Sequence, residues 1–234
     1  MQSRPTPLLC ELHAHSTWSD GALGIRQLVD LYGRRGFDVL AITDHATRDV
    51  REVHAANYDA YLSAVEDEAE RAWHLYRLLV VPGLELTFDD PDPLASAHAV
   101  AVGLRSYVDV AAGVETMLRA ARAHGAALVA AHPYTAEEAE TSQRRTARFA
   151  SDRETLVPLV HRFELFNRDT LFGWVAEAGL PSVGNGDFHR VEHLIGWKTM
   201  LPCAKEEAAV VDYLRSARPA YLVRLDERRY LRAA

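Results

Sequence analysis

The chain has 234 residues, of which 48% are apolar and 25% are charged, and its formal net charge is −7. This length suits one sizeable core, so we expect a single domain over residues 1–234. The negative charge provides no basic surface, which argues against binding to long nucleic acid. The apolar runs are too short to cross a bilayer, and the N-terminus lacks the pattern of a signal peptide, so we expect a cytoplasmic protein with no membrane partner.

Short apolar runs alternate with helical patterns from one end of the chain to the other. The apolar runs predict strands at Leu8–His13, Val39–Thr43, Leu79–Glu85, His98–Leu104, Ala127–Ala131, Phe163–Phe166, Ser182–Gly186 and Ala220–Val223. The helical patterns predict helices at Ile25–Arg35, Arg51–Tyr76, Val114–His124, parts of Glu137–Val160, Thr170–Ala178 and Lys205–Ala217. Such alternation is typical of βα units around a parallel sheet, so we expect an α/β barrel.

Residues 135–154 differ in composition from the rest of the chain. They are rich in Glu, Thr, Arg and Ser, and they include Arg144, Arg145 and Arg148. Two interpretations stay open at this stage. The segment could form a loop or lid over a functional site, or a solvated helix with charge pairs four residues apart.

Nine side chains of the kinds that bind metals stand at or near the ends of the predicted strands. They are His13, His15, Asp20, His45, Glu85, His98, His132, Asp187 and His189. The carboxyl ends of parallel strands meet at one rim of a barrel, so these residues can converge although they are far apart in the sequence. His98 is the exception, because it opens its predicted strand.

Period-two spacing strengthens the assignment of two pairs. Residues two apart on a strand face the same side, which pairs His13 with His15 and Asp187 with His189. Glu11 lies on the face of the first pair, so we expect its carboxylate to orient a ligand.

Two aspartates have more than one interpretation. Asp20 stands next to Gly21 and could be a ligand, a turn residue or the cap of the following helix. Asp44 could be a metal ligand, a partner of His45 or a proton donor.

Imidazole and carboxylate ligands together suit Zn, Mn or Fe, whereas calcium prefers oxygen ligands alone. Nine ligands exceed what one ion takes from a protein while keeping an open position. We therefore expect two or three divalent ions with a bridging carboxylate. Such a centre activates water at neutral pH and binds the oxygens of an in-line displacement, which indicates metal-assisted hydrolysis.

Four motifs resemble those of the polymerase and histidinol phosphatase (PHP) superfamily. The first comprises Glu11-Leu12-His13-Ala14-His15-Ser16 with Ser19-Asp20-Gly21, and the second is Ala41-Ile42-Thr43-Asp44-His45. Gly83-Leu84-Glu85 with His98, and Ala131-His132-Pro133, resemble the third, and Gly186-Asp187-Phe188-His189 resembles the fourth. Glu11 stands where the superfamily often has Asp. The stretch Leu194–Thr199, followed by a helix, is also similar to the superfamily's ending.

The resemblance implies a distorted (β/α)7 TIM-like barrel with a bi- or trinuclear metal site and hydrolysis of phosphoesters. By this resemblance, His13, His15, Glu85 and Asp187 hold one ion. Glu85 bridges to a second ion, which His98 and His132 also hold. The third ion is held by Asp20, His45 and His189.

The leading hypothesis is a phosphoesterase that acts on a small phosphomonoester or nucleotide, in which a metal-bridging hydroxide attacks phosphorus. Asp20, His45 or His189 would then be near the leaving oxygen and could assist its protonation. Three alternatives stay open: a phosphodiesterase or 3′-exonuclease, a hydrolase of C–N bonds, and a non-catalytic metal-binding accessory module.

Three further residues are candidates for binding the substrate. Arg190 and Arg168 could contact phosphate, because a guanidinium group binds phosphate through two hydrogen bonds. Trp18 lies between His15 and Asp20 and could stack on a ring of the substrate or pack beneath its own loop. No apolar stripe indicates an oligomeric state.

Overall fold

The structure is a computed structural model that describes residues 6–47, 52–142 and 146–226. Its strands are β1 (Leu8–Glu11), β2 (Val39–Ile42), β3 (His45–Ala46), β4 (Leu79–Phe88), β5 (Ala97–Val102), β6 (Ala127–Ala130), β7 (Arg162–Asn167), β8 (Thr170–Leu171), β9 (Ser182–Asn185), β10 (Gly196–Leu201) and β11 (Tyr221–Leu225). Its α-helices are α1 (Ile25–Arg34), α2 (Tyr58–Tyr76), α3 (Val114–Ala123), α4 (Ala136–Ser142), α5 (Arg148–Ser151), α6 (Arg153–Leu156), α7 (Gly173–Glu177) and α8 (Glu207–Arg215). Short 3₁₀ helices occupy Val110–Ala112, Val157–Leu159 and Val191–Leu194.

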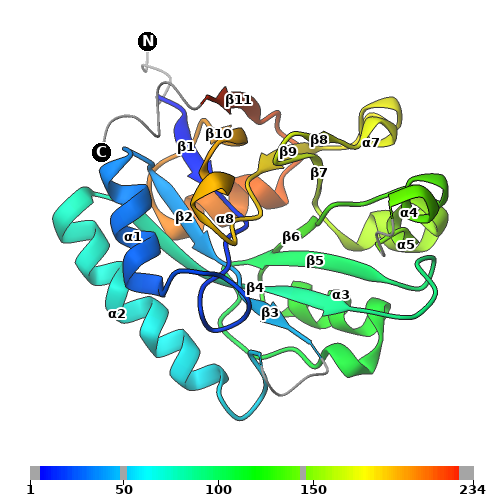
Figure 1. The fold of residues 1–234 in the computed structure, drawn as a ribbon, viewed down its shortest axis with the longest axis horizontal. Coiled ribbons are helices and arrows are strands. Elements are labelled where there is room, and N and C mark those ends of the chain that lie inside the picture. The colour runs from blue at the N-terminus through cyan, green and yellow to red at the C-terminus, as the bar shows by residue number, and fades with distance from the viewer. Residues whose placement is uncertain (1–5, 48–51, 143–145, 227–234) are drawn as a thin grey trace.

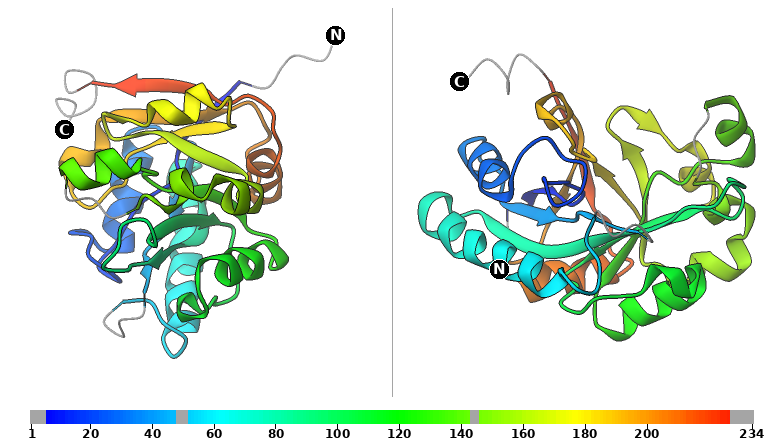
Figure 2. Two further views of the ribbon diagram at one scale, coloured as in Figure 1. Left: turned by 90° about the vertical axis from the view of Figure 1, so that its right-hand side faces the viewer. Right: turned by 60° about the horizontal axis from the view of Figure 1, so that its bottom comes forward.

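One curled sheet organises the molecule (Figure 1). Its strand order is β11-β10-β1-β2-β4-β5-β6-β7-β8, with β3 beside β4 and β9 beside β7. The helices lie around the outside of the curl (Figure 2). A large apolar core includes buried residues of α1, α2 and α3, and a second core joins the strands to α8. These cores leave the rim of the curl to polar side chains.

The prediction of a parallel sheet was only partly right. β5 runs antiparallel to both β4 and β6, and β10 runs antiparallel to β1 and β11. The cause is local for β5, because residues 89–96 connect it to β4 as a hairpin without a crossover helix. The amino end of β5 therefore lies at the same rim as the carboxyl ends of the parallel strands. This reversal explains why His98 can open its strand and still face the other candidates.

The barrel closes in two different ways along its seam. At the rim, Ala14 pairs with Phe188 in the segment that follows β9. Farther from the rim, β10 lies between β1 and β9, and the Thr199 hydroxyl both donates to the Gly184 carbonyl and accepts from the Gly184 amide, at 2.8 and 3.0 Å. A side chain thus replaces backbone pairing there. The expected fold class, a distorted TIM-like α/β barrel, is confirmed.

Several predicted boundaries move in the structure. Helix α2 begins at Tyr58, because the Asn57 side chain accepts from the His54 amide at 2.7 Å and forms a turn before it. Arg51, where this helix was expected to begin, lies outside the described residues. Thr170 and Leu171 form a short hairpin strand, so α7 begins only at Gly173.

The described residues of the segment 135–154 form short helices. It contains α4, α5 and the start of α6, and its residues Ala147 and Phe149 are fully buried in the core. Arg144 and Arg145 lie outside the described residues. A lid function for this segment stays a prediction.

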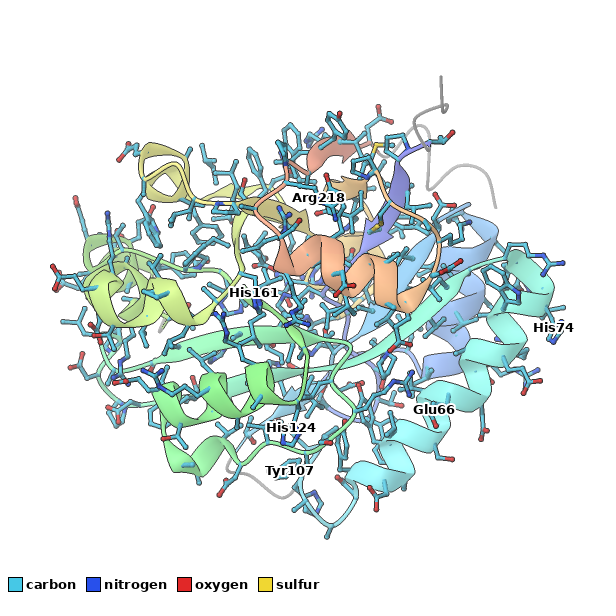
Figure 3. The ribbon with its side chains drawn as sticks, turned by 180° about the vertical axis from the view of Figure 1, so that it is seen from behind. Glu66, His74, Tyr107, His124, His161 and Arg218 are labelled. Carbon is cyan, nitrogen blue, oxygen red and sulfur yellow. The ribbon has the colours of Figure 1, made fainter. Side chains whose placement is uncertain are left out.

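Three histidines lie away from the rim, on the face seen in Figure 3. His74 is in the last turn of α2, His124 ends α3, and the Nδ1 atom of His161 accepts a hydrogen bond from the Leu128 amide at 2.9 Å. None of the three belongs to the candidate metal clusters among the described residues. Among the described residues, no helix is both long and apolar enough to span a membrane.

Candidate metal centre

The seam at the rim brings two residue pairs together. Besides the bridge between Ala14 and Phe188, the His15 amide donates to the Phe188 carbonyl at 2.8 Å, and the Phe188 amide donates to the His13 carbonyl at 3.0 Å. Ala14 and Phe188 are buried, so their neighbours in sequence point the opposite way. Those neighbours are His13 and His15 on one strand, and Asp187 and His189 on the other.

Glu85 lies at the centre of the candidate ligands. It lies inside β4 rather than at its end, because β4 continues to Phe88 and pairs with β3 and β5. Its carboxylate is fully buried and has an imidazole nitrogen within 3.3 Å in five directions. The five histidines are His13 at 3.2 Å, His15 at 3.3 Å, His45 at 2.9 Å, His98 at 3.2 Å and His132 at 3.1 Å.

The nine predicted residues form three clusters among the described residues, and two of these clusters share His15. The potential ligand atoms of each cluster lie within 4.8 Å of one another. The clusters are His13, His15 and Asp187; Glu85, His98 and His132; and His15, Asp20, His45 and His189. This grouping resembles the division implied by the motifs, except that Glu85 appears only with His98 and His132, and His15 also joins the cluster of Asp20, His45 and His189. The structure thus brings together every residue that the sequence nominated as a ligand.

Unpaired polar atoms at the centre fit divalent ions. Within the described chain, the buried atoms His13 Nε2, His15 Nε2 and Glu85 Oε2 have no hydrogen-bond partner. Leaving such atoms unpaired is costly, and a cation that accepts their lone pairs removes the cost. Imidazole nitrogen with carboxylate oxygen is a donor set that Zn, Mn and Fe accept. The donor atoms of this centre therefore fit a site for Zn, Mn or Fe.

Charges at the centre are strongly coupled. Burial opposes ionisation of Glu85, but His45 and His13 more than offset it and hold its pKa well below the usual range. Burial likewise opposes a charge on His45, yet Glu85 raises the pKa of His45 to about 9. Burial and the adjacent His45 lower the pKa of His15 to about 3. His15 is therefore a neutral imidazole, the form that binds a metal ion.

Three residues that the sequence analysis did not single out hold the other nitrogens of these rings. Glu164 lies 2.9 Å from His13 Nδ1, Asp89 lies 3.0 Å from His98 Nε2, and Thr146 Oγ1 lies 3.1 Å from His132 Nδ1. Such partners fix the orientation of a ligand ring and the nitrogen that carries its proton. Glu164 was the most detectable, because it is a lone carboxylate inside an apolar strand.

Glu164 also ties several segments together. It is fully buried, and it accepts hydrogen bonds from the His132 amide at 2.7 Å and from the side-chain amides of Asn167 and Asn185 at 2.8 and 2.9 Å. The Glu164 carboxylate thus holds both the ring of His13 in one cluster and the backbone of His132 in another.

Glu11 contacts the backbone of the candidate ligands and not a ligand ring. Its carboxylate accepts from the amides of Gly186 and His13 at 2.9 and 3.3 Å, and it forms a buried ion pair with Lys198 at 2.7 Å. A Cβ atom on Gly186 would collide with both charged groups. Gly186 therefore has to be glycine, and this packing sets the position of Asp187 next to it.

Asp20 reaches the third cluster, and Asp44 supports its loop. Asp20 Oδ1 lies 3.2 Å from His189 Nε2 and 3.6 Å from His45 Nε2, while the cap of α1 is Gly24, so Asp20 is not the helix cap. Asp44 accepts from the Ser16 amide at 2.7 Å and from the Ser19 hydroxyl at 2.7 Å. It belongs to none of the clusters found in the described part of the chain. Asp44 therefore positions the loop that carries Asp20.

The candidate substrate residues differ in their surroundings. Trp18 is half-buried, and its ring packs edge-on against Tyr61 with 5.6 Å between the ring centroids. Of the two roles considered for Trp18, this contact favours packing beneath its own loop over stacking on a substrate ring. The Arg190 side chain is 69% exposed, and its nearest carboxylate is Glu192 at 3.8 Å.

Arg168 lies directly against the centre. Its Nη2 atom donates to the Asp187 carboxylate at 3.0 Å and to the Asp187 carbonyl at 2.9 Å. The backbone of Arg168 has a φ of +55°, which is unusual for a residue other than glycine. The Trp197 amide holds the Arg168 carbonyl at 3.1 Å. The fold thus fixes this guanidinium at the edge of the clusters.

No protein-family model matches the sequence. A crystal structure of a two-domain protein from Bacteroides vulgatus, described as containing a PHP-like metal-dependent phosphoesterase, is similar to this chain with a TM-score of 0.66 and 21% identity, over 94% of this chain and 66% of that one. The fold is that of the PHP-like proteins. The fold that the four motifs led us to expect is therefore confirmed.

Other proteins share the PHP-like fold or part of this sequence. Structures described as a metal-dependent phosphoesterase from Bifidobacterium adolescentis and as an amidohydrolase from Chromobacterium violaceum with bound sulfate and no metal each have a TM-score of 0.50, with 17% and 15% identity, over 77% of this chain and 87% of theirs. The DNA polymerase/3′-5′ exonuclease PolX of Bacillus subtilis (strain 168) is 34% identical over 105 residues, which is 41% of this chain. The matched region spans 18% of PolX.

Proposed function

We propose that this chain is a metal-dependent phosphoesterase of the PHP type that hydrolyses a small phosphomonoester or a nucleotide. The observation that carries the proposal is the convergence of nine imidazole and carboxylate groups around Glu85, with unpaired buried atoms at its centre. The relatives described as metal-dependent phosphoesterases support it at the level of the fold. The net charge of −7 favours a small substrate over long nucleic acid.

Three groups of residues share the chemistry in this proposal. The clusters around Glu85 would hold two or three ions, and such ions would supply Lewis-acid stabilisation of the phosphoryl oxygens and lower the pKa of water. Glu164 and Glu11 hold the imidazole of His13 and the backbone before Asp187 in place. Arg168 offers its guanidinium to a phosphate oxygen.

We assign the third cluster to the leaving group. His13 and His15 are fully buried, whereas the side chain of Asp20 is 53% exposed and that of His189 is 22% exposed. A leaving group that departs to solvent therefore passes Asp20 and His189. We assign to this cluster the protonation of the leaving oxygen in a centre with two ions, and the binding of the third ion in a centre with three.

The first test is phosphate release from a panel of phosphomonoesters and nucleotides with added Mn²⁺. We expect His15→Ala to lower the rate by more than about a hundredfold, because His15 contributes to two clusters. His74→Ala, on the opposite face, is the matched control and should behave as wild type. Release that survives in His15→Ala would disprove the assignment of the centre.

The same panel separates the alternatives. Cleavage of phosphodiesters or trimming of a DNA 3′ end, without monoester turnover, would favour the exonuclease reading, to which the similarity with PolX gives some weight. Release of ammonia from amides would favour the C–N hydrolase reading. Bound metal without turnover of any substrate would identify an accessory module.

Arg168 is expected to contribute to substrate binding. Arg168→Met should raise KM by about tenfold, equivalent to ~1.4 kcal/mol, because one charged contact to phosphate is lost. Arg168→Lys keeps the charge without the planar fork and should give an intermediate KM. We expect Arg190→Ala to raise KM less, since Arg190 is farther into solvent. Steady-state kinetics with metal content measured in parallel would decide, and an unchanged KM in Arg168→Met would remove it from the substrate site.

A further inference from the structure

Thr146 contacts a ligand ring from outside the four motifs. It is 3% exposed and follows directly on residues 143–145, which lie outside the description. Its hydroxyl donates to the His132 carbonyl at 2.7 Å, and the same oxygen lies 3.1 Å from His132 Nδ1. One hydroxyl therefore contacts both the backbone and the ring of a single candidate ligand.

These two contacts decide which nitrogen of His132 carries the proton. A hydroxyl has one hydrogen, and the short contact to the carbonyl uses it. Thr146 can then only accept from the ring, so Nδ1 carries a hydrogen and Nε2 is left with its lone pair. His132 Nε2 lies 3.1 Å from Glu85 Oε1, so two electron-pair donors face each other. With a neutral ring, that arrangement is favourable only with a metal cation between them.

The backbone of His132 also depends on this contact. Its φ of +30° is rare for a residue with a side chain and costs free energy unless the surroundings hold it. Its amide donates to Glu164, and its carbonyl accepts from Thr146. The strained residue is thus fixed on both sides.

The residues next to Thr146 hold the other histidine of the same cluster. The Ala147 amide donates to the Pro93 carbonyl and the Arg148 amide donates to the Ser96 carbonyl, each at 3.1 Å. Pro93 and Ser96 belong to the hairpin that leads into β5, where His98 is the second residue. Residues 146–148, which we name the clip, therefore contact both segments that supply histidines to the cluster.

We propose that the clip assembles the cluster of Glu85, His98 and His132, with Thr146 as the positioning residue that presents His132 Nε2 to a metal ion. The proposal rests on the metal-binding part of the proposed function and does not depend on which substrate is hydrolysed. By this proposal, residues 146–148 of the segment 135–154 help to build the metal centre, although they lie outside the four motifs.

The test measures metal binding directly. Zinc would be titrated into the metal-free protein by calorimetry, with bound ions counted after equilibrium dialysis. Thr146→Val keeps the shape of the side chain and removes the hydroxyl, so the affinity for one ion should fall about 10- to 100-fold while the remaining binding is unchanged. Thr146→Ser restores the hydroxyl and should bind as wild type. Thr141→Val, in exposed α4 of the same segment, is the matched control.

A second measurement keeps the proposal testable if Thr146→Val fails to fold. Nitrogen-15 NMR of histidine in the zinc-loaded wild type, with His132 assigned by loss of its signals in His132→Gln, should show zinc on Nε2 and hydrogen on Nδ1. Zinc on Nδ1, or unchanged zinc binding in a folded Thr146→Val, would overturn the proposal. Zinc binding as expected without phosphate release would overturn the proposed function alone.

Discussion

Glu85→Gln should abolish most of the metal binding and lower phosphate release by about a thousandfold. Glu85 lies within 3.3 Å of nitrogen atoms of five histidines, and these histidines belong to all three clusters. An amide keeps the size of the side chain but offers a neutral oxygen and a nitrogen that cannot bind a cation. The loss of one anionic ligand at such a centre costs about 4 kcal/mol in the transition state.

The measurements are bound metal per chain and the rate of phosphate release, on protein shown to be folded by circular dichroism. Glu115→Gln is the matched control, because Glu115 is a half-exposed residue of α3 that pairs with Arg119 at 3.7 Å. Full metal content in Glu85→Gln would show that the centre does not depend on this carboxylate. Lost metal with a retained fold would support its central role, whatever the substrate proves to be.

Arg162→Met should lower the free energy of unfolding by about 4 kcal/mol without touching the metal centre. Arg162 is fully buried in β7, and its guanidinium donates to the carbonyls of Leu214, Tyr213, Ser216 and Arg218 at 2.7 to 3.1 Å. These carbonyls lie in and just beyond the last turn of α8, where the helix dipole is negative. Methionine would remove the side-chain donor of the buried Leu214 carbonyl and three further donations, although the Tyr213 carbonyl would still accept from Ser216. Arg218 is labelled in Figure 3.

Urea unfolding followed by circular dichroism measures this effect. Arg162→Lys keeps the charge but makes fewer hydrogen bonds, so its stability should lie between those of wild type and Arg162→Met. Arg215→Met is the control, since Arg215 is half-exposed and its ion pair with Asp212 at 3.9 Å contributes little. Equal unfolding midpoints for Arg162→Met and wild type would contradict the assigned role.

The sequence allowed the fold class and the nine clustered residues to be predicted, because their signals are local. Period-two spacing marks His13 with His15, and apolar runs mark the strands before them. The direction of β5 was not predictable in this way, since the apolar pattern of a strand does not indicate whether it runs parallel or antiparallel to its neighbours. His98 was nominated correctly by its motif while its strand was oriented wrongly. The hairpin between β4 and β5 explains how His98 can open its strand and still lie at the rim.

The strand β10 and the roles of Glu164 and Thr146 were not predicted, because they depend on contacts between separate segments of the chain. β10 was missed as a strand because Lys198 interrupts its apolar pattern, and its burial depends on Glu11, far away in the chain. Glu164 and Thr146 act on ligand rings that lie 151 and 14 positions away. No spacing rule connects such residues. Their roles become visible only when the barrel places them side by side.

The seam between Ala14 and Phe188 has a consequence for how the protein reaches its native state. It joins segments from opposite ends of the described chain, as does the Glu11 contact to the Gly186 amide across 175 positions. Contacts of such long range form late, after the intervening chain has condensed and its loop entropy has been lost. The first motif is synthesised early, yet its histidines acquire Asp187 and His189 as neighbours only when the barrel closes. The chain therefore cannot assemble its complete centre before most of its sequence has emerged from the ribosome.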